Sequence, residues 1–352
     1  MENSGKKKIL VAPLNWGLGH ATRCIPIINA LKTLYFDPVI ASDGNALALL
    51  KKEFPSLRSI ELPSYNINYP NKGSNFRAKL IKDSPHLIKT IKKEKKAVKS
   101  IVERETISGI ISDNRFGVRH KAIPSVFITH QLKVLSGNTT WLSTKLHQKI
   151  ISKFDECWVP DHKGEHNLSG DLGQDNVKST KTKYIGPLSR FQKHNSEIKY
   201  DLLVLLSGPE PQRTFLEQKL LNELEYFNGS VLFVKGLIET TQKKQNNNNI
   251  TIYNYMTSGE LEEAINKSEI VLSRSGYTTI MDLAKLEKKA FFIPTPGQFE
   301  QEYLANRLNE LKIIPCCSQD DFKIEMLNNI EDYSGFKSNP FQVDFENLFS
   351  LF

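Results

Sequence analysis

The chain has 352 residues, of which 39% are hydrophobic and 24% are charged. This composition is typical of a soluble globular protein, and because a single core seldom exceeds about 250–300 residues we expect two domains. The net charge of +8 favours anionic partners, and no apolar run approaches the roughly 20 residues that a membrane-spanning helix needs. The four cysteines lack disulfide or metal-ligand spacing, and no secretory segment precedes the first predicted strand. We therefore expect a cytoplasmic protein with reduced thiols.

Short apolar runs alternate with helical patterns in the first half of the chain. KILVAP predicts a strand at Lys8–Pro13, followed by a glycine loop and a helix over Ala21–Tyr35. Further strands are predicted at Pro38–Ser42, Gly109–Ser112, Ser125–Thr129 and Glu156–Val159, with a helix at Asn45–Glu53 and a lysine-rich helix before Gly109. Strands separated by helices of 10–15 residues indicate parallel pairing with right-handed crossovers.

The lysine-rich segment carries much of the positive charge, because eight lysines lie between Lys79 and Lys99. A solvated helix face is the simpler interpretation. The alternative is contact with an anionic membrane surface, which would make the protein peripheral on the inner face of the cytoplasmic membrane. Nucleic acid is not expected as a partner, because no aromatic residues interleave the lysines and no recognition motif is visible.

The pattern of strands and helices restarts after a break at Gly186-Pro187. Strands are predicted at Asp201–Leu206, Val231–Val234, Thr251–Tyr253, Glu269–Leu272 and Ala290–Ile293, with a helix at Gln212–Leu224. The polar run Gln245–Asn249 is predicted to be an exposed loop. We therefore expect an α/β protein with two doubly wound domains, at residues 1–187 and 188–352, whose C-terminal tail can pack back on the N-terminal domain.

The glycine loop NWGLGHATR follows the first predicted strand and contains Gly17, Gly19 and His20. The glycines permit a tight turn and close approach of a ligand, and the helix that begins here favours anions. The positive end of that helix should keep His20 neutral and able to accept a proton, although a histidine that merely caps the helix is an alternative. Asp113 ends another predicted strand of this domain and is either an acceptor-side residue or a buried structural aspartate.

The segment LSRSGYTTIMDLAKL resembles an anion site, because a strand ends at Leu272 and a helix follows a short turn. Backbone amides, hydroxyls and a positive charge are expected to converge on a diphosphate; the residues concerned are Arg274, Ser275, Gly276 and Thr278. Asp282 lies one turn further along the helix. It can accept hydrogen bonds from ribose hydroxyls; compensation of the helix dipole is the alternative.

Two other loops follow predicted strands of the second domain. Gln301 and Glu302 lie near the start of a helix after a Pro/Gly loop, and an amide beside a carboxylate suits recognition of sugar hydroxyls; a polar first turn is the alternative. Ser207 and Gly208 lie where open α/β sheets bind ligands. Arg213 either reaches a phosphate or pairs with Glu210 or Glu217.

Together these segments resemble the inverting GT-B glycosyltransferases of family 28, which include the enzyme that completes lipid II and the galactolipid synthases. The resemblance is strongest over Ser273–Arg307. It implies that His20 activates the acceptor and that the turn at Arg274 binds the donor diphosphate. It also implies donor contacts for the remaining positions: Asp282 on the ribose, Gln301 and Glu302 on the sugar, and Tyr255 and Met256 near the uracil.

The sequence thus predicts an inverting glycosyltransferase that moves a sugar from a nucleotide donor, taken to be a UDP-sugar, to the hydroxyl of an acceptor glycan or glycolipid of the cell envelope. His20 or Asp113 is the candidate base, and the donor is expected in the cleft between the domains. No Asp-x-Asp element follows a strand, so we expect no metal ion or other cofactor. A nucleotide-sugar hydrolase or 2-epimerase on the same fold is an alternative, and a non-catalytic nucleotide-sugar-binding subunit is another.

Overall fold

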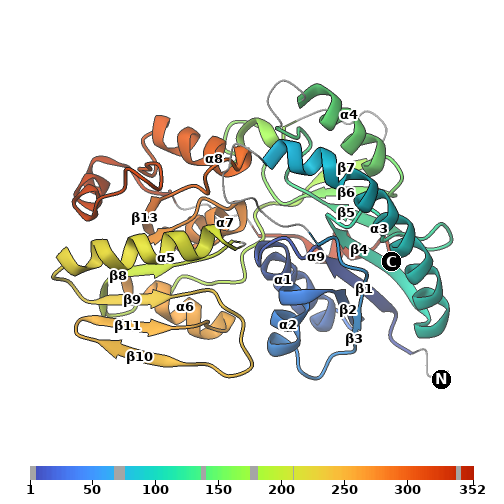
Figure 1. The fold of residues 1–352 in the computed structure, drawn as a ribbon. Coiled ribbons are helices and arrows are strands. Elements are labelled where there is room, and N and C mark those ends of the chain that lie inside the picture. The colour runs from blue at the N-terminus through green and yellow to red at the C-terminus, as the bar shows by residue number, and fades with distance from the viewer. Residues whose placement is uncertain (1–4, 67–75, 136–139, 175–180, 209, 338–341) are drawn as a thin grey trace. The chain divides into compact units, whose positions relative to one another are not determined.

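In the computed structural model, the chain forms two compact units (Figure 1). Unit 1 comprises Met1–Asn66, Leu80–Leu188 and Phe341–Phe352, and unit 2 comprises Ile67–Lys79 and Ser189–Pro340. The structure describes residues 5–66, 76–135, 140–174, 181–208, 210–337 and 342–352, with the backbone alone for 76–84. Each unit is an α/β layer structure built on its own sheet.

Unit 1 contains a parallel sheet with the strand order β3-β2-β1-β4-β5-β6-β7. Its inner strands are buried apolar runs, which is typical of a parallel sheet covered on both faces. The strands are β1 (Lys8–Pro13), β2 (Asp37–Ser42), β3 (Ser59–Glu61), β4 (Ile107–Asp113), β5 (Ser125–Ile128), β6 (Glu156–Val159) and β7 (Lys181–Tyr184). The helices are α1 (Gly19–Thr33), α2 (Gly44–Glu53), α3 (Phe76–Glu105), α4 (Thr140–Ile151), the 3-10 helix η3 (Gly170–Leu172) and α9 (Phe345–Phe349).

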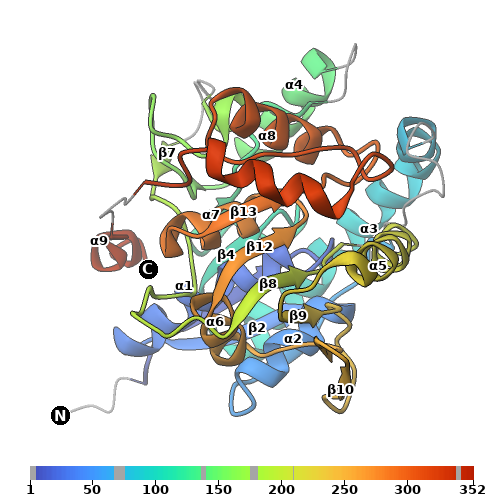
Figure 2. The ribbon, with the colours of Figure 1, turned by 90° about the vertical axis from the view of Figure 1, so that its left-hand side faces the viewer.

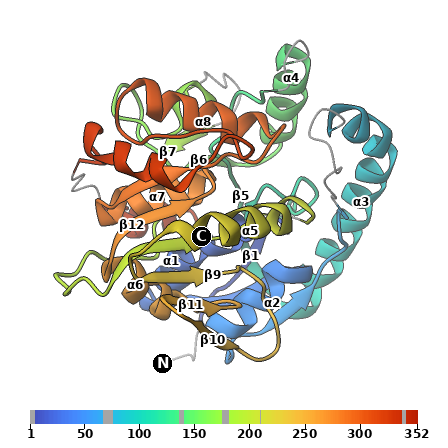
Figure 3. The ribbon, with the colours of Figure 1, turned by 60° about the vertical axis from the view of Figure 1, so that its left-hand side comes forward.

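The long helix α3 (Figure 3) packs through one narrow face. Thr90, Glu94, Val98 and Ile101 are buried, a spacing of three or four residues that repeats along one side of a helix. The lysines of the described part of the helix, Lys89, Lys92, Lys93, Lys95, Lys96 and Lys99, are exposed. The side chains of Lys79 and Lys82, which belong to the predicted basic segment, lie outside the described residues. The basic segment is therefore a solvent-facing surface over its described length.

Unit 2 contains a sheet with the order β10-β11-β9-β8-β12-β13 (Figure 2). All pairs are parallel except β10 with β11. The strands are β8 (Tyr200–Leu205), β9 (Val231–Val234), β10 (Lys244–Asn247), β11 (Ile250–Tyr253), β12 (Ser268–Ser273) and β13 (Lys289–Phe292). The helices are α5 (Gln212–Glu223), η4 (Leu224–Tyr226), α6 (Ser258–Asn266), α7 (Tyr277–Leu286), α8 (Phe299–Glu310) and η5 (Ile324–Asp332).

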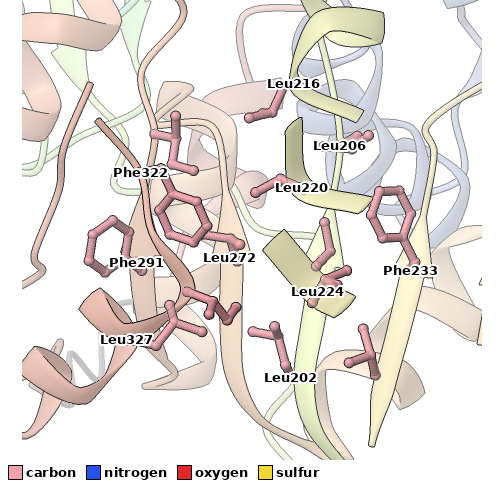
Figure 4. Close-up of a cluster of buried hydrophobic side chains, with 14 of the residues drawn as sticks. Leu202, Leu206, Leu216, Leu220, Leu224, Phe233, Leu272, Phe291, Phe322 and Leu327 are labelled. Atoms are coloured by element: carbon pink, nitrogen blue, oxygen red, sulfur yellow. The ribbon is translucent and has the colours of Figure 1, made fainter. Parts of the chain in front are cut away.

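One side of the unit 2 sheet packs into a single apolar cluster (Figure 4). Leucines of β8 and α5 meet Phe233 of β9, Leu272 of β12 and Phe291 of β13. Phe291 and Phe322 make an edge-to-face pair with ring centroids 5.6 Å apart. Because the strands of this sheet are fixed by a shared core, the loops at their carboxyl ends start from a rigid base.

The structure corrects the prediction for the asparagine-rich segment. Gln245–Asn249 was expected to be a loop, but β10 pairs with β11 through a two-residue turn at Asn248–Asn249. The prediction of exposure is confirmed, since Lys244–Asn247 is exposed throughout. An edge strand of this kind satisfies its backbone through one neighbour and needs no buried side chain, so the apolar pattern did not indicate it.

The C-terminal segment lies on unit 1. Phe349 of α9 packs edge-on against Phe36, with ring centroids 5.8 Å apart, and Phe352 lies 6.3 Å from Trp158. Gly109 of β4 leaves room for the Phe352 ring, because a Cβ at this glycine would lie 2.3 Å from it. The final residues are thus part of the unit 1 core.

None of the described helices has the length and apolar character that crossing a membrane requires.

Candidate functional site

The two units share one topological feature, a switch point at which the chain leaves neighbouring parallel strands in opposite directions. In unit 1 this point lies between β1 and β4, where Pro13 is in register with Asp113. In unit 2 it lies between β8 and β12, where Leu205 is in register with Ser273. Open α/β sheets bind ligands at the carboxyl ends of strands at such points. Four of the segments singled out in the sequence lie at the ends of these strands, whereas Gln301 and Glu302 come after β13 and Tyr255 and Met256 after β11.

At the switch point of unit 1, the structure brings His20 and Asp113 together. His20 lies in the first turn of α1 and Asp113 is the last residue of β4. The Nδ1 atom of His20 is 2.8 Å from Oδ1 of Asp113. The Asp113 side chain is fully buried, whereas the His20 side chain retains 14% exposure. A carboxylate that orients a partly exposed imidazole is an arrangement suited to proton transfer.

Two further side chains of this cluster were missed in the sequence. Arg23, one turn along α1 from His20, is 1% exposed and contacts both carboxylate oxygens of Asp113. Its Nη2 atom lies 2.9 Å from Nδ1 of His20, and its Nη1 atom lies 3.0 Å from Nδ1 of His130, in the loop after β5. An arginine in a helix usually faces solvent, so no local pattern indicated its burial.

The charges in this cluster determine its protonation. Burial opposes ionisation of Asp113, but Arg23 and His20 outweigh it and lower the pKa of Asp113 to about 2. Burial also lowers the pKa of His20; Asp113 opposes this shift, and Arg23 and His130 reinforce it. An ionised Asp113 can only accept, and Nη2 of Arg23, which also lies near Nδ1 of His20, has Asp113 as its own acceptor. We therefore assign the proton of neutral His20 to Nδ1, which leaves Nε2 as the acceptor.

A neutral His20 was predicted from the helix dipole. In the structure, burial and the charges of Arg23 and His130 are what lower the pKa of His20. α1 begins after Leu18 without a side-chain cap, and the His20 ring is directed at Asp113 instead. The alternative of a capping histidine is therefore not what the structure shows. The glycine loop itself is anchored before Gly17, since Asn15 Nδ2 lies 3.2 Å from Oδ2 of Asp43.

A buried arginine fixes the surroundings of this loop. Arg115 donates to Asp43 at 2.6 Å and to Glu94 of α3 at 2.7 Å. Asp43 is also the residue that binds Asn15. Gly17 has a φ of +75°, and a Cβ at this position would meet nothing within 4 Å, so the loop is held at its base and open at the glycine.

At the switch point of unit 2, the turn after β12 is built differently from the prediction. The Arg274 side chain was expected to supply a positive charge to a diphosphate. Instead it is 1% exposed and donates to the carbonyl oxygens of Ile293, Pro294 and Gln212 at 3.1, 2.9 and 3.0 Å. It also donates to Oε1 of Gln319 at 2.6 Å. Arg274 therefore ties neighbouring segments together through its two Nη atoms, while its buried Nε has no hydrogen-bond partner among the described residues.

Beyond Arg274, this turn leads into the N-terminus of α7, where the first backbone amides of the helix lie. Gly276 is the residue before the helix, which starts with no side-chain cap and no acidic residue in its first turn. Ser275 is buried and donates to the carbonyl of Gln301 at 2.8 Å. Thr278 lies in the first turn and is 9% exposed. Backbone amides at an uncapped helix start are a suitable site for a phosphate.

The Asp282 side chain contacts Ser189, where the chain enters unit 2, and is not open to solvent. Its Oδ1 atom accepts from Ser189 Oγ at 2.7 Å, and the residue is 7% exposed. Burial raises its pKa to about 6, although Arg190 and Ser189 act in the opposite direction. A carboxylate in this position is costly without a ligand, because Ser189 and Arg190 compensate its burial only in part.

The remaining predicted residues occupy loops of the same sheet edge. Gln301 Oε1 accepts from the backbone of Thr295 at 2.9 Å, and Glu302 Oε1 accepts from that of Gly297 at 2.7 Å. Both side chains therefore shape the loop before α8, and direct sugar contact stays a prediction. Ser207 is half-buried, and Gly208 has a φ of +103° with open space around it.

The two interpretations of Arg213 are now distinguished in this structure. Arg213 pairs with Glu210 at 2.6 Å and with Glu217 at 2.5 Å, as the alternative to phosphate binding predicted. Tyr255 is 7% exposed, and its carbonyl accepts from Gln242 Nε2 at 3.0 Å. Met256 follows it and is half-buried. Base recognition by this segment stays a prediction.

The folds of the two units match those of solved glycosyltransferases. The glycosyltransferase of kitacinnamycin is similar over all of this chain and 94% of its own, with a TM-score of 0.60 at 12% identity. MurG from Acinetobacter baumannii is similar over 93% and 90%, with a TM-score of 0.51 at 13% identity. The rhamnosyltransferase SpnG complexed with thymidine diphosphate gives a TM-score of 0.57 at 12% identity, over 92% of this chain and 89% of its own. The chain thus has the GT-B fold, two doubly wound α/β domains.

A narrower relationship covers the second unit. Residues 213–342 match the glycosyltransferase family 28 C-terminal domain. A curated relative from Haemophilus ducreyi is 22% identical over 210 residues, which is 58% of this chain. Its name is UDP-N-acetylglucosamine--N-acetylmuramyl-(pentapeptide) pyrophosphoryl-undecaprenol N-acetylglucosamine transferase, and the match spans 56% of its length.

Proposed function

We propose that this protein is an inverting glycosyltransferase that transfers a sugar from a nucleotide donor bound by unit 2 to an acceptor hydroxyl activated by His20 of unit 1. The observation that carries the proposal is the family 28 C-terminal domain over residues 213–342, which includes the uncapped start of α7 and Asp282. The His20–Asp113 pair at the other switch point supplies the base that such a reaction needs.

In the proposed reaction, Nε2 of His20 takes the proton of the acceptor hydroxyl. The hydroxyl oxygen forms a bond to the anomeric carbon while the bond from that carbon to the diphosphate oxygen breaks, which inverts the configuration. Asp113 stabilises the imidazolium that forms. The negative charge that develops on the departing diphosphate is stabilised by the backbone amides at the start of α7.

For the donor we propose a UDP-sugar. The H. ducreyi relative uses UDP-N-acetylglucosamine by its name, and a structurally similar rhamnosyltransferase binds thymidine diphosphate. Asp282 is the residue we assign to the ribose, because its buried carboxyl regains hydrogen-bonding partners when two hydroxyls reach it. The proposal assigns Tyr255 and Met256 to the base and Gln301 and Glu302 to the sugar.

For the acceptor we propose a glycolipid presented at an anionic membrane surface. The exposed lysines of α3 are one support, and helix α4 is another. Trp141, Leu142 and Leu146 of α4 are 67%, 51% and 56% exposed, and the ammonium group of Lys145 lies 4.2 Å from the Trp141 ring centroid. Exposed aromatic and aliphatic side chains among lysines are typical of interfacial helices.

The test of the proposed function uses the purified full-length chain, a panel of nucleoside diphosphates and their sugars, and a lipid extract as acceptor source. We expect a nucleoside diphosphate to raise the melting temperature by mass action and a labelled sugar to pass to a lipid product. Rapid release of free sugar without acceptor, or formation of a sugar isomer, would instead indicate a hydrolase or an epimerase. Donor binding without turnover would indicate a non-catalytic subunit, and absence of nucleotide binding at millimolar concentration would refute the proposal.

The membrane part of the proposal is tested separately by co-sedimentation with vesicles. We expect binding to vesicles that contain phosphatidylglycerol and weak binding to pure phosphatidylcholine, because the surface is basic. The variant Trp141→Ser should bind more weakly, while the control Tyr226→Ser, at an exposed aromatic residue of unit 2, should bind as the unaltered protein does. Equal binding of the Trp141 variant would overturn the role of α4.

A further inference from the structure

The side chain at the centre of the unit 1 cluster is Arg23. It reaches from α1 to Asp113 at the end of β4 and to His130 after β5, and it also lies beside His20 in the preceding turn of its own helix. Both the arginine and the aspartate are buried, with exposures of 1% and 0%. A guanidinium in this setting is held by a fixed geometry, because its planar donors match a carboxylate in pairs.

The hydrogen-bonding capacities of these groups indicate which ring nitrogen carries the proton in two imidazoles. Nδ1 of His20 lies 2.8 Å from Oδ1 of Asp113, which can only accept, and 2.9 Å from Nη2 of Arg23, which can only donate. Because Nη2 of Arg23 has Oδ1 of Asp113 as its acceptor, whereas two acceptors 2.8 Å apart would repel each other, we assign the Nδ1 proton to the hydrogen bond with Asp113. Arg23 can only donate, so its 3.0 Å contact with His130 requires that Nδ1 of His130 be unprotonated. Neutral His20 therefore presents Nε2 as an acceptor, whereas neutral His130 carries its proton on Nε2.

The charge of Arg23 also balances that of Asp113. A carboxylate alone beside His20 would favour the imidazolium, which cannot accept a proton. The guanidinium neutralises this attraction while leaving the orienting hydrogen bond in place. The groups that act on the charge of His20 are Asp113 from β4, Arg23 from α1 and His130 from the loop after β5; the buried thiol of Cys24 lies 3.8 Å from Asp113.

We propose that Arg23 is a positioning residue of the candidate active site, which keeps His20 a neutral, correctly oriented base by neutralising Asp113 and fixing His130. The proposal rests on the proposed function for its catalytic meaning, but its electrostatic content concerns the protein alone. The GHATR segment thus contributes two residues to the candidate site, Arg23 as well as His20.

The test is an NMR titration of the histidine side chains in the full-length, isotope-labelled protein without substrate, with His20 assigned from the His20→Asn spectrum. We expect Arg23→Gln to raise the pKa of His20 by about one unit, because a nearby positive charge is lost, and Asp113→Asn to lower it, because a nearby negative charge is lost. Arg23→Lys restores the charge without the paired geometry, so it should recover most of the pKa while altering the tautomer signals of His130. A purely structural role would not produce shifts of opposite sign.

Kinetics add a second measurement. If the chain is a glycosyltransferase, Arg23→Gln should reduce kcat at pH 7 at least about tenfold with the donor KM unchanged, and part of the loss should be recovered at higher pH as His20 deprotonates. A folded Arg23→Gln protein whose His20 titrates as in the unaltered chain would overturn the proposal. Should Arg23→Gln not fold, an Arg23→Lys protein whose His130 keeps its tautomer, together with an Asp113→Asn protein whose His20 pKa is not lowered, would overturn it equally. Because the titration needs no turnover, its outcome is independent of whether the proposed reaction is right.

Discussion

The two switch points of this protein have the same topology but different chemistry. In unit 1, ionisable side chains meet at the carboxyl ends of β1 and β4: His20, Arg23 and Asp113 form a buried, charge-balanced group. In unit 2, the side chain of comparable charge, Arg274, donates to carbonyl oxygens of neighbouring loops. There the groups that we propose for anion binding are the backbone amides that begin α7.

This difference shows how one fold can divide a reaction. A base must change its protonation state, so it needs a side chain whose pKa the surroundings set. A diphosphate needs fixed dipoles that do not reorganise during the reaction, so backbone amides on a rigid loop are sufficient. We therefore propose that equivalent loops of two similar sheets separate proton transfer from anion binding, and substitutions at the two sites should have distinguishable effects.

The largest effect is expected from His20→Ala. Removal of the base should reduce sugar transfer about 100-fold or more, while nucleotide affinity stays unchanged because unit 2 is intact. Turnover and calorimetric nucleotide binding measure the two quantities, and His166→Ala, at an exposed histidine, is the control. Loss of nucleotide binding in His20→Ala would contradict the separation of roles between the units.

Arg274→Ala should act mainly on stability. It leaves buried carbonyl oxygens of Ile293, Pro294 and Gln212 without their donor, which we expect to lower the free energy of unfolding by about 3–5 kcal/mol. Urea unfolding measures this change, and Arg104→Ala, at an exposed arginine, should cost less than about 1 kcal/mol. A stable Arg274→Ala protein that has merely lost nucleotide affinity would restore the original prediction of direct phosphate contact.

A pH-dependent effect is expected at Asp282. Its pKa rises from 3.8 to about 6 on folding, so the carboxyl favours the folded state in its protonated form. Stability should therefore decrease as the pH rises from 4 to 6, by up to about 3 kcal/mol at 1.36 kcal/mol per unit. Asp282→Asn should remove this loss, making the ligand-free protein more stable at pH 7 but weaker in nucleotide binding.

Unfolding in urea at pH 4.5 and pH 7 measures the Asp282 effect, with the exposed Asp332→Asn as the matched control. The two variants should differ at pH 7 and agree more closely at pH 4.5. If Asp282→Asn were the less stable variant at pH 7, the buried carboxylate would be a stabilising structural group, and its assignment to a ribose would lose its physical basis.

The smallest effect is expected from Gly109→Ala in unit 1. A methyl group here would lie 2.3 Å from the Phe352 ring, and displacement of the C-terminal residue should cost about 1–2 kcal/mol. Combining it with Phe352→Leu should give less than the sum of the two single costs, since the smaller side chain relieves the overlap. If the losses of stability in the two single variants added up to that of the double variant, residues 109 and 352 would not be in contact.

The sequence predicted those strands whose side chains are buried and apolar. Lys8–Pro13 and Ser125–Thr129 were predicted as strands because their side chains are almost all apolar, as expected where both faces of a sheet are covered; the observed strands are Lys8–Pro13 and Ser125–Ile128. The edge strands β7 (KTKY) and β10 (KQNN) were missed, because half-buried or exposed edges accept charged and amide side chains.

The candidate site was predictable in part for a related reason. Glycine loops after strands have a local signature, which located His20 and the turn before α7. The direction in which a long side chain points has no such local signature. Arg23 and Arg274 are both buried, but Arg23 contacts Asp113 beside the candidate base, whereas Arg274 donates to a carbonyl oxygen of a neighbouring loop. Which of these occurs depends on acceptors brought together by tertiary folding, such as Asp113 and the carbonyl of Ile293.

The position of α9 has a consequence for how the protein can be divided. Phe349 and Phe352 come from the extreme C-terminus but fill space beside Phe36, Trp158 and Gly109. A fragment that ends at the unit boundary, after Leu188, would expose that apolar surface and should associate or unfold. During synthesis on the ribosome, the amino-terminal sheet would therefore complete its packing only after Phe349 and Phe352 have been made.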